Sequence, residues 1–445
     1  MRSAFIARQP IFNRRLEAVG CELLFRGHGW ADDDRSESPQ RATATVVLNS
    51  LTELDLPRIV GRKQAWVDVP REFVTDGLAQ AIPPGLSGLE ISGLEDFDEA
   101  LVEALRALRG QGYQLAIDGF GPGTPTGPVL ELFDIVKLDI QTLGCDGVRE
   151  QVDRLAGTRC TILGDGIATY AERDFCLSVG CELLQGHFFC QPAVAGTRGI
   201  SANRLALLQV VSALQRTDIE LREVEQLIGH DVALSFRMLR YVNSAAIGLR
   251  GEVRSIRQAL ALLGLENARR WAALSVLASV DDKPSELTLT ALTRARFCEL
   301  AGEAAEIASA PELFTLGLFS VLDALMDTPM SEAAELLPLA DDMRVALVER
   351  RGRMGELLEA VIARECGRRS DVPNVPRADE FYLRAVIWAD NAAESLFGDM
   401  PGEEPVTLGL PASAQGVGPV IVLRPQLGLL ERLLAAIGRL FGRVA

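Results

Sequence analysis

The chain has 445 residues, of which 48% are hydrophobic and 24% are charged, and a globular protein of this length is expected to form about two to three domains. Its net charge of -16 disfavours nonspecific nucleic-acid binding, which needs a basic face. No N-terminal stretch resembles a signal peptide and no apolar run is long enough to span a membrane. We therefore expect a cytoplasmic protein that binds no nucleic acid.

The first part of the chain, residues 1–195, mixes short apolar runs with amphipathic stretches. The runs predict strands at residues 18–25, 65–70, 88–92, 113–120, 134–140 and 160–167. Between them lie helical patterns such as residues 97–112, with leucines at helical spacing and a glycine at the end. Strands that alternate with helices favour a parallel sheet and an α/β fold.

From residue 196 to about residue 400 the strand pattern disappears. Leucine- and alanine-rich segments predict helices at residues 203–216, 219–228, 231–242, 255–263, 266–280, 285–309 and 311–326. This second part is therefore predicted to be an all-α domain, joined to the first by a connector at residues 191–200.

The C-terminal residues read as a linker, 401–425, and an amphipathic helix, 426–445, with a local net charge of +2 from three arginines and one glutamate. Packing of this helix on its own domain or in a homodimer is the simpler interpretation. Docking to a membrane surface or to a groove on a partner is the alternative.

Charged residues stand at or near the carboxyl ends of the predicted strands. They are Glu22, Asp68, Glu90, Asp118, Lys137 and Asp165. In a parallel β/α barrel these ends converge on one face, where active sites are built. A single residue of this kind is more often a solvated surface group, but the series suggests a site. Clustered carboxylates could hold divalent ions that activate water against a phosphodiester, while Lys137 could orient a water or a phosphate.

The motifs "CELLFRG", "GLEIS", "AIDGFGPG", "VKLDI", "GDGIAT" and "LLQGHFFCQP" occur in that order in the first part of the chain. Together they resemble the EAL domain, a β/α barrel of the TIM type that hydrolyses cyclic di-GMP. The resemblance places metal ligands at Glu22, Glu90 and Asp118 and the catalytic lysine at Lys137. It implies that ligand contacts come from the following residues: Glu22, Leu24, Arg26, Asp68, Asp165 and Gln185.

The chain departs from this family at several positions. Asp68 stands where the family has asparagine, and Asp118-Gly119 stands where it has two aspartates. Asp165 and Ala168 replace a pair of glutamates. Loss of metal ligands is costly, so we expect a degenerate, noncatalytic barrel with no resident cofactor. Mg²⁺ or Mn²⁺ is expected only if metal binding is retained.

The helical part, with "LIGHDVALSFRMLRYVNSAAIG", resembles the HDOD domain. Its single histidine, His230, cannot form the multi-histidine metal site of related hydrolases, and Asp231 is expected to cap a helix. The leading hypothesis is a bacterial signalling protein. Its barrel would sense cyclic di-GMP or protein partners, and its HDOD domain would act through protein contacts. The alternatives are a weak or active metal-dependent phosphodiesterase and a scaffold that binds no nucleotide.

Overall fold

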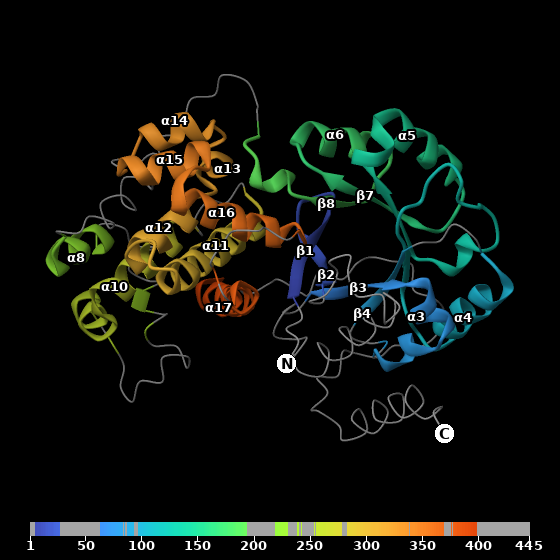
Figure 1. The fold of residues 1–445 in the computed structure, drawn as a ribbon, viewed down its shortest axis with the longest axis horizontal. Coiled ribbons are helices and arrows are strands. Elements are labelled where there is room, and N and C mark those ends of the chain that lie inside the picture. The colour runs from blue at the N-terminus through green and yellow to red at the C-terminus, as the bar shows by residue number, and fades with distance from the viewer. Residues whose placement is uncertain are drawn as a thin grey trace.

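A computed structural model of the protein shows a β/α barrel beside a bundle of helices, with the N-terminal strand at the boundary between them (Figure 1). The structure describes residues 5–26, 63–82, 84, 87–92, 97–193, 219–229, 238–239, 242, 253, 255–277, 283–337, 339–368, 375 and 377–397. Several predictions fall outside these residues: the connector from residue 194, the helix 203–216, most of the helix 231–242, His230, Asp231, the linker 401–425 and the helix 426–445.

Eight strands close into a barrel in chain order. Their bounds are Phe5–Asn13 (β1), Ala18–Arg26 (β2), Gln64–Pro70 (β3), Ser87–Ser92 (β4), Leu115–Ile117 (β5), Ile135–Asp139 (β6), Thr161–Ile167 (β7) and Leu183–Gly186 (β8). Strands β2 to β8 run parallel, whereas β1 is antiparallel to both of its neighbours, β2 and β8. The predicted parallel sheet is therefore confirmed for β2 to β8, and β1 is the exception.

The direction of β1 follows from the short turn that joins it to β2. In this turn the side-chain oxygen of Asn13 accepts hydrogen bonds from the backbone N–H groups of Arg15 and Glu17. A connection this short can join only antiparallel strands, because a parallel neighbour requires a long crossover. The sequence did not predict β1, since Arg8, Gln9 and Pro10 interrupt its apolar pattern.

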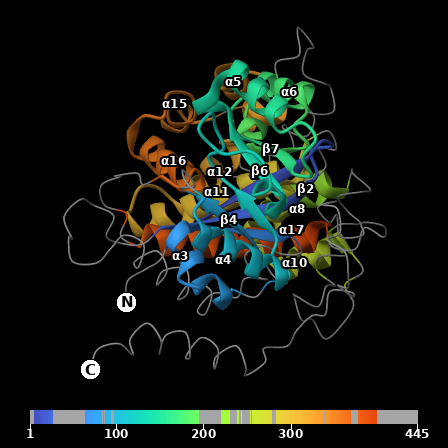
Figure 2. The same cartoon turned by 90° about the vertical axis from the view of Figure 1, so that its right-hand side faces the viewer.

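Helices cover the outside of the barrel (Figure 2). They are α3 (Arg71–Thr75), α4 (Glu99–Gly110), α5 (Ile140–Arg154) and α6 (Tyr170–Val179), with short 3₁₀ turns at Leu78–Ala81, Leu130–Leu132 and Phe188–Cys190. The predicted helix at 97–112 is α4. Asp98 caps its first turn by accepting from the N–H of Leu101, and Leu101, Leu105 and Leu108 form its buried stripe.

The bottom of the barrel interior is filled by an apolar layer. It consists of Ile11, Val19, Trp66, Ala116, Ile135, Leu163 and Leu183. Trp66 is the largest member, and a Cβ placed on Gly88 of the neighbouring strand would lie 2.5 Å from its ring. Glycine at position 88 therefore makes the room that Trp66 needs. This layer is the floor of the barrel's polar upper half.

All the secondary-structure elements described in the second part of the chain are helices. Its helices are α8 (Leu221–Gly229), α10 (Ile256–Leu277), α11 (Ser285–Ala304), α12 (Ala310–Phe319), α13 (Leu322–Met326), α14 (Met330–Glu335), α15 (Asp341–Glu349), α16 (Gly352–Glu365) and α17 (Ala378–Phe397). This confirms an α/β barrel followed by an all-α domain. Among the described residues no helix is long and apolar enough to cross a lipid bilayer.

Two predicted helix bounds were wrong. The helix predicted at 285–309 ends at Ala304, because Glu306 adopts a left-handed backbone conformation with φ 51°. The helix predicted at 311–326 is two helices, α12 and α13, separated by Ser320 and Val321. The serine hydroxyl accepts from the buried guanidinium of Arg294, and a polar contact of this kind cannot be read from apolar spacing.

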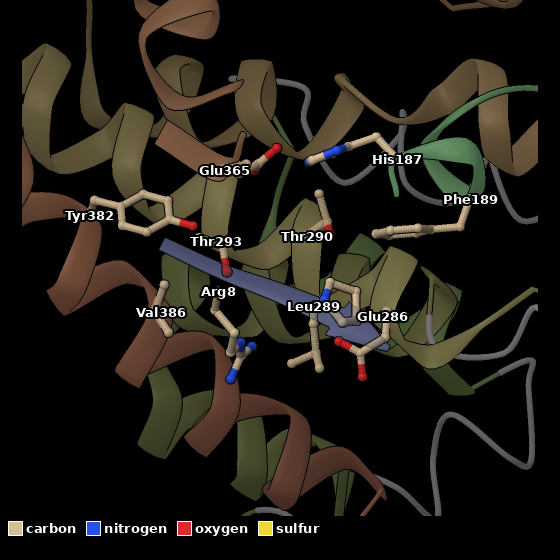
Figure 3. A pocket seen from close by; sticks show the side chains of 11 residues that line it. Arg8, His187, Phe189, Glu286, Leu289, Thr290, Thr293, Glu365, Tyr382 and Val386 are labelled. Atoms are coloured by element: carbon tan, nitrogen blue, oxygen red, sulfur yellow. The ribbon is translucent and has the colours of Figure 1, made fainter. Parts of the chain in front are cut away.

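The barrel and the helical part share a polar boundary. Helices α16 and α17 contact β1, and Arg8 on β1 pairs with Asp390 on α17 at 2.6 Å. Lys63, just before β3, pairs with the buried Glu286 on α11. Arg8 and Glu286, with Tyr382 and others, line a cavity of about 40 Å³ (Figure 3).

Candidate functional site

Seven consecutive strands each place one polar side chain at the carboxyl end of the barrel. In strand order these are Glu22, Asp68, Glu90, Asp118, Lys137, Asp165 and Gln185, with Asp118 directly after β5. Two residues before each of them stands a residue of the layer below. In strand order these are Gly20, Trp66, Gly88, Ala116, Ile135, Leu163 and Leu183. Because side chains alternate along a strand, a two-residue step keeps both members of a pair inside the barrel.

Lys137 is the centre of the group. Its Nζ donates to Glu22 Oε2 at 2.9 Å and to Glu90 Oε1 at 2.5 Å, and Asp165 Oδ2 lies 3.7 Å away. Only 3% of the lysine side chain is exposed. Burial by itself lowers the pKa of Lys137, but attraction to Glu22 and Glu90 outweighs it and holds the pKa well above the ordinary value. Lys137 is therefore a fixed positive charge.

The surrounding carboxylates carry more negative charge than Lys137 neutralises. Burial and repulsion from Glu22 raise the pKa of Glu90 well above its ordinary value. Burial, with repulsion from Glu22 and Asp118, raises the pKa of Asp68 to about 6. Burial also raises the pKa of Asp165 to about 6, although Lys137 opposes the shift. Such a cluster favours binding of a proton or a cation.

Two buried oxygen atoms in the cluster have no hydrogen-bond partner: Asp68 Oδ1 and Gln185 Oε1. The amide of Gln185 is held from its other side, since its Nε2 donates to Glu22 Oε2 at 2.5 Å and to Gln9 Oε1 at 3.2 Å. A buried acceptor without a partner is costly. A donor or a cation at this end of the barrel would satisfy both oxygens.

These residues fit a hard divalent cation in one respect. All donors are oxygen atoms, which Mg²⁺, Mn²⁺ and Ca²⁺ prefer. Over the described residues, however, no group of three or more histidine, cysteine or acidic side chains is arranged around one point in metal-binding geometry. The ammonium of Lys137 already pairs with Glu22 and Glu90. A cation bound by these two carboxylates would compete with it.

The remaining predicted ligand contacts are Leu24 and Arg26 on β2. Leu24 is half-buried, and a Cβ on Gly367, just after α16, would lie 2.9 Å from its Cδ1. Its side chain therefore packs against the helical part. Arg26 ends β2, and its side chain lies outside the described atoms. Gln9 is a partner of the site that sequence reasoning missed, because β1 itself was missed.

Gly119 and Ala168, which depart from the expected motifs, lie in backbone segments with a defined conformation. Gly119 has φ +70°, a left-handed conformation in which most side chains are strained, although aspartate is among those that tolerate it. The backbone N–H of Ala168 donates to Glu172 Oε2 at 2.7 Å, and Glu172 completes the capping box of α6 with Thr169. Glu172 is therefore engaged in capping this helix.

Comparison with known proteins shows which family the chain belongs to. Residues 205–352 match the HDOD domain family. The chain is 32% identical over 380 residues to the cyclic di-GMP phosphodiesterase CdgJ of Vibrio cholerae serotype O1, covering 83% of this chain and 86% of that protein. The chain belongs to the EAL–HDOD family. A second relative of this EAL–HDOD protein, the uncharacterized YuxH of Bacillus subtilis strain 168, is 26% identical over 420 residues, 88% of this chain and 99% of YuxH.

Among solved structures, the phosphodiesterase PaMucR in complex with cyclic di-GMP is similar with a TM-score of 0.36. It is 17% identical, and the match covers 42% of this chain and 94% of that one.

The HDOD match ends at residue 352, where α16 begins. The two described helices after the match, α16 and α17, both contact β1 of the barrel.

Proposed function

We propose that this EAL–HDOD protein is a noncatalytic receptor for cyclic di-GMP. The barrel binds the nucleotide at the carboxyl ends of β2 to β8, and the HDOD domain transmits the bound state to protein partners. The family relationship to a protein named as a cyclic di-GMP phosphodiesterase supports the choice of ligand.

One observation carries the proposal. Seven polar side chains converge at the carboxyl end of the barrel, and three of their carboxyl groups have raised pKa values, which supports binding of a ligand there. Yet its lysine is already neutralised by Glu22 and Glu90. A receptor needs only polar side chains that contact the nucleotide at the carboxyl end of the barrel, such as Gln185 and Asp68. Two-metal hydrolysis needs further carboxylates.

The positions that would supply those carboxylates argue against turnover. Gly119 has no side chain, Ala168 cannot ligate a metal, and Glu172 is occupied by the cap of α6. If a single divalent ion binds, its ligands would come from Glu22, Glu90 and Asp118. It would screen the phosphates of the nucleotide.

A weak metal-dependent phosphodiesterase is the second candidate. It is favoured by the presence of Glu22, Glu90, Asp118 and Lys137 around one centre and by the name of the relative CdgJ. In this case Lys137 would orient a water or a phosphate once a metal had taken over its two carboxylates. A scaffold without nucleotide binding is the third candidate, and it gives no role to the seven polar side chains at the carboxyl end of the barrel.

The test is a calorimetric titration of the full-length protein with cyclic di-GMP, with Ca²⁺ and with a chelator. We expect stoichiometric binding to the wild type. Arg26→Ala should weaken it by about 1.5–3 kcal/mol, the range for hydrogen bonds to charged groups. Arg149→Ala, an exposed arginine on α5, is the matched control and should bind as the wild type does.

Glu22→Gln separates the roles of metal and nucleotide. It should weaken binding more with Ca²⁺ than with the chelator, because only a metal-bound form needs that carboxylate. Absence of binding under both conditions, with an intact circular dichroism spectrum, would leave the scaffold hypothesis.

A further inference from the structure

A thiol and an imidazole meet across the boundary between the barrel and the helical part. Cys366 directly follows α16, and His187 directly follows β8. The Cys366 Sγ lies 3.6 Å from His187 Nε2 and 3.9 Å from Nδ1. The imidazole stacks on Phe189, with ring centroids 6.5 Å apart and planes at 17°, and both side chains line the cavity at the boundary (Figure 3). The ring is therefore held in place beside the sulfur.

The charges around Cys366 favour its thiolate. Burial raises the pKa of the thiol, but the hydrogen bond and charge of His187, together with a hydrogen bond from Arg368, outweigh burial and bring the pKa below its ordinary value. Glu365 is the opposing charge from the same segment. A thiolate stabilised by an adjacent imidazole is the reactive form of cysteine.

No other cysteine combines these properties. Six of the eight are buried: Cys21, Cys160, Cys176, Cys181, Cys190 and Cys298. Of these only Cys176 has a lowered pKa, through a hydrogen bond with Cys181, and it is out of contact with solvent. Cys145 is exposed but lies on α5, away from any histidine contact that the structure describes. Cys366 is half-buried, between these two extremes.

We propose that Cys366 is a site of reversible oxidation by small hydroperoxides, with His187 as the base that accepts the thiol proton. The thiolate attacks the peroxide, an S–O bond forms and the O–O bond breaks. Sulfur is oxidised to the sulfenic acid, and the peroxide is reduced to an alkoxide or hydroxide. The imidazolium of His187 then returns its proton to that leaving group, so the net products are the sulfenic acid and an alcohol or water.

The test treats the full-length reduced protein with about one equivalent of hydrogen peroxide and traps sulfenic acid with dimedone, followed by peptide mass spectrometry. Cys145 is the internal reference. We expect Cys366 to be labelled about tenfold faster than Cys145 near neutral pH, because a neighbouring imidazole stabilises the thiolate of a cysteine. His187→Gln should reduce the Cys366 rate by a similar factor and leave Cys145 unchanged.

A second measurement needs no substitution. The rate of alkylation by chloroacetamide is followed against pH for both cysteines of the wild type. The midpoint for Cys366 should lie below that for Cys145. The proposal is overturned if Cys145 reacts as fast as Cys366 in the peroxide experiment, if the two alkylation midpoints coincide, or if folded His187→Gln protein keeps the wild-type rate at Cys366.

Discussion

At the scale of single residues, Asp68 is the clearest sign of unbalanced charge in the barrel. Its pKa is about 6 in the folded protein and about 3.9 in an unfolded chain. The folded state therefore binds this proton more readily. Above pH about 6 the ionised group destabilises the fold, and the penalty fades as the pH falls toward about 4.

The substitution Asp68→Asn removes this penalty. We expect it to raise the free energy of unfolding by about 1–2 kcal/mol near pH 7.5 and by much less near pH 4, because the penalty of the raised pKa disappears below the unfolded pKa. Urea unfolding at both pH values measures the difference. Asp146→Asn, on an exposed aspartate, is the control. An equal gain at both pH values would show that the pKa of Asp68 is not raised in the native protein.

Lys137 has the opposite role, since it compensates the buried negative charge. Lys137→Met leaves Glu22 and Glu90 without their cation, and removing one partner of a buried ion pair typically costs about 3–5 kcal/mol. We expect that loss in urea unfolding at neutral pH. Part of it should be recovered at lower pH, because Glu90, whose pKa is already raised, then takes up a proton.

The matched control for Lys137→Met is Arg149→Met, which removes an exposed ion pair with Asp146 and should change stability by less than about 1 kcal/mol. If Lys137→Met were as harmless as this control, the lysine would not be the counter-ion of the cluster.

At the scale of elements, the stability of the barrel depends on the packing of the Trp66 ring against Gly88 of the neighbouring strand. Gly88→Ala would place a methyl carbon 2.5 Å from the indole ring. Neither strand can shift easily in a closed barrel, so we expect a loss of about 1–3 kcal/mol. Gly123→Ala, where no atom lies within 4 Å of the added carbon, is the control. Thermal unfolding of both variants compares them, and equal stability would contradict the packing of the floor.

The strands also show which parts of the fold and the site could be predicted from the sequence. Strands β2 to β7 were predicted because their apolar runs are continuous and end in a charged residue. Those charged ends placed Glu22, Asp68, Glu90, Asp118, Lys137 and Asp165, and the structure brings them together at one end of the barrel. Gln185 came from the motif resemblance alone, since β8 is only Leu183–Gly186.

Other features depend on long-range contacts that no local pattern records. Gln9 reaches the site because β1 closes the barrel against β8, and that closure is a property of the whole sheet. The ion pair between β1 and the helical part joins Arg8 to Asp390, which are 382 positions apart in the sequence. Periodicity is a local signal, so it predicts neither the closure nor the boundary.

At the scale of the whole molecule, the barrel and the helical part are held together by buried charge. Glu286 on α11 is 4% exposed and pairs with Lys63, close to Arg8. Attraction to these two cations outweighs burial and lowers the pKa of Glu286. Its stabilising effect is therefore present above the unfolded pKa and is lost as the pH falls through the folded value.

Glu286→Gln tests this boundary. We expect a loss of about 1–3 kcal/mol at neutral pH, because Lys63 is left without its anion but remains partly exposed. The loss should shrink in acid. Glu303→Gln, an exposed glutamate on the same helix, is the control. Differential scanning calorimetry should show one transition for the wild type, and two separate transitions in the wild type would mean that the two parts unfold independently.

The central claim is that the barrel binds cyclic di-GMP without hydrolysing it. The most direct measurement incubates the full-length protein with the nucleotide and Mn²⁺ or Mg²⁺, measures bound nucleotide by equilibrium dialysis and chromatographs the products over time. The account predicts stoichiometric binding of intact cyclic di-GMP, with less than one turnover. Steady conversion of many equivalents to the linear dinucleotide, abolished by Glu22→Gln and Lys137→Met, would contradict it and establish a phosphodiesterase.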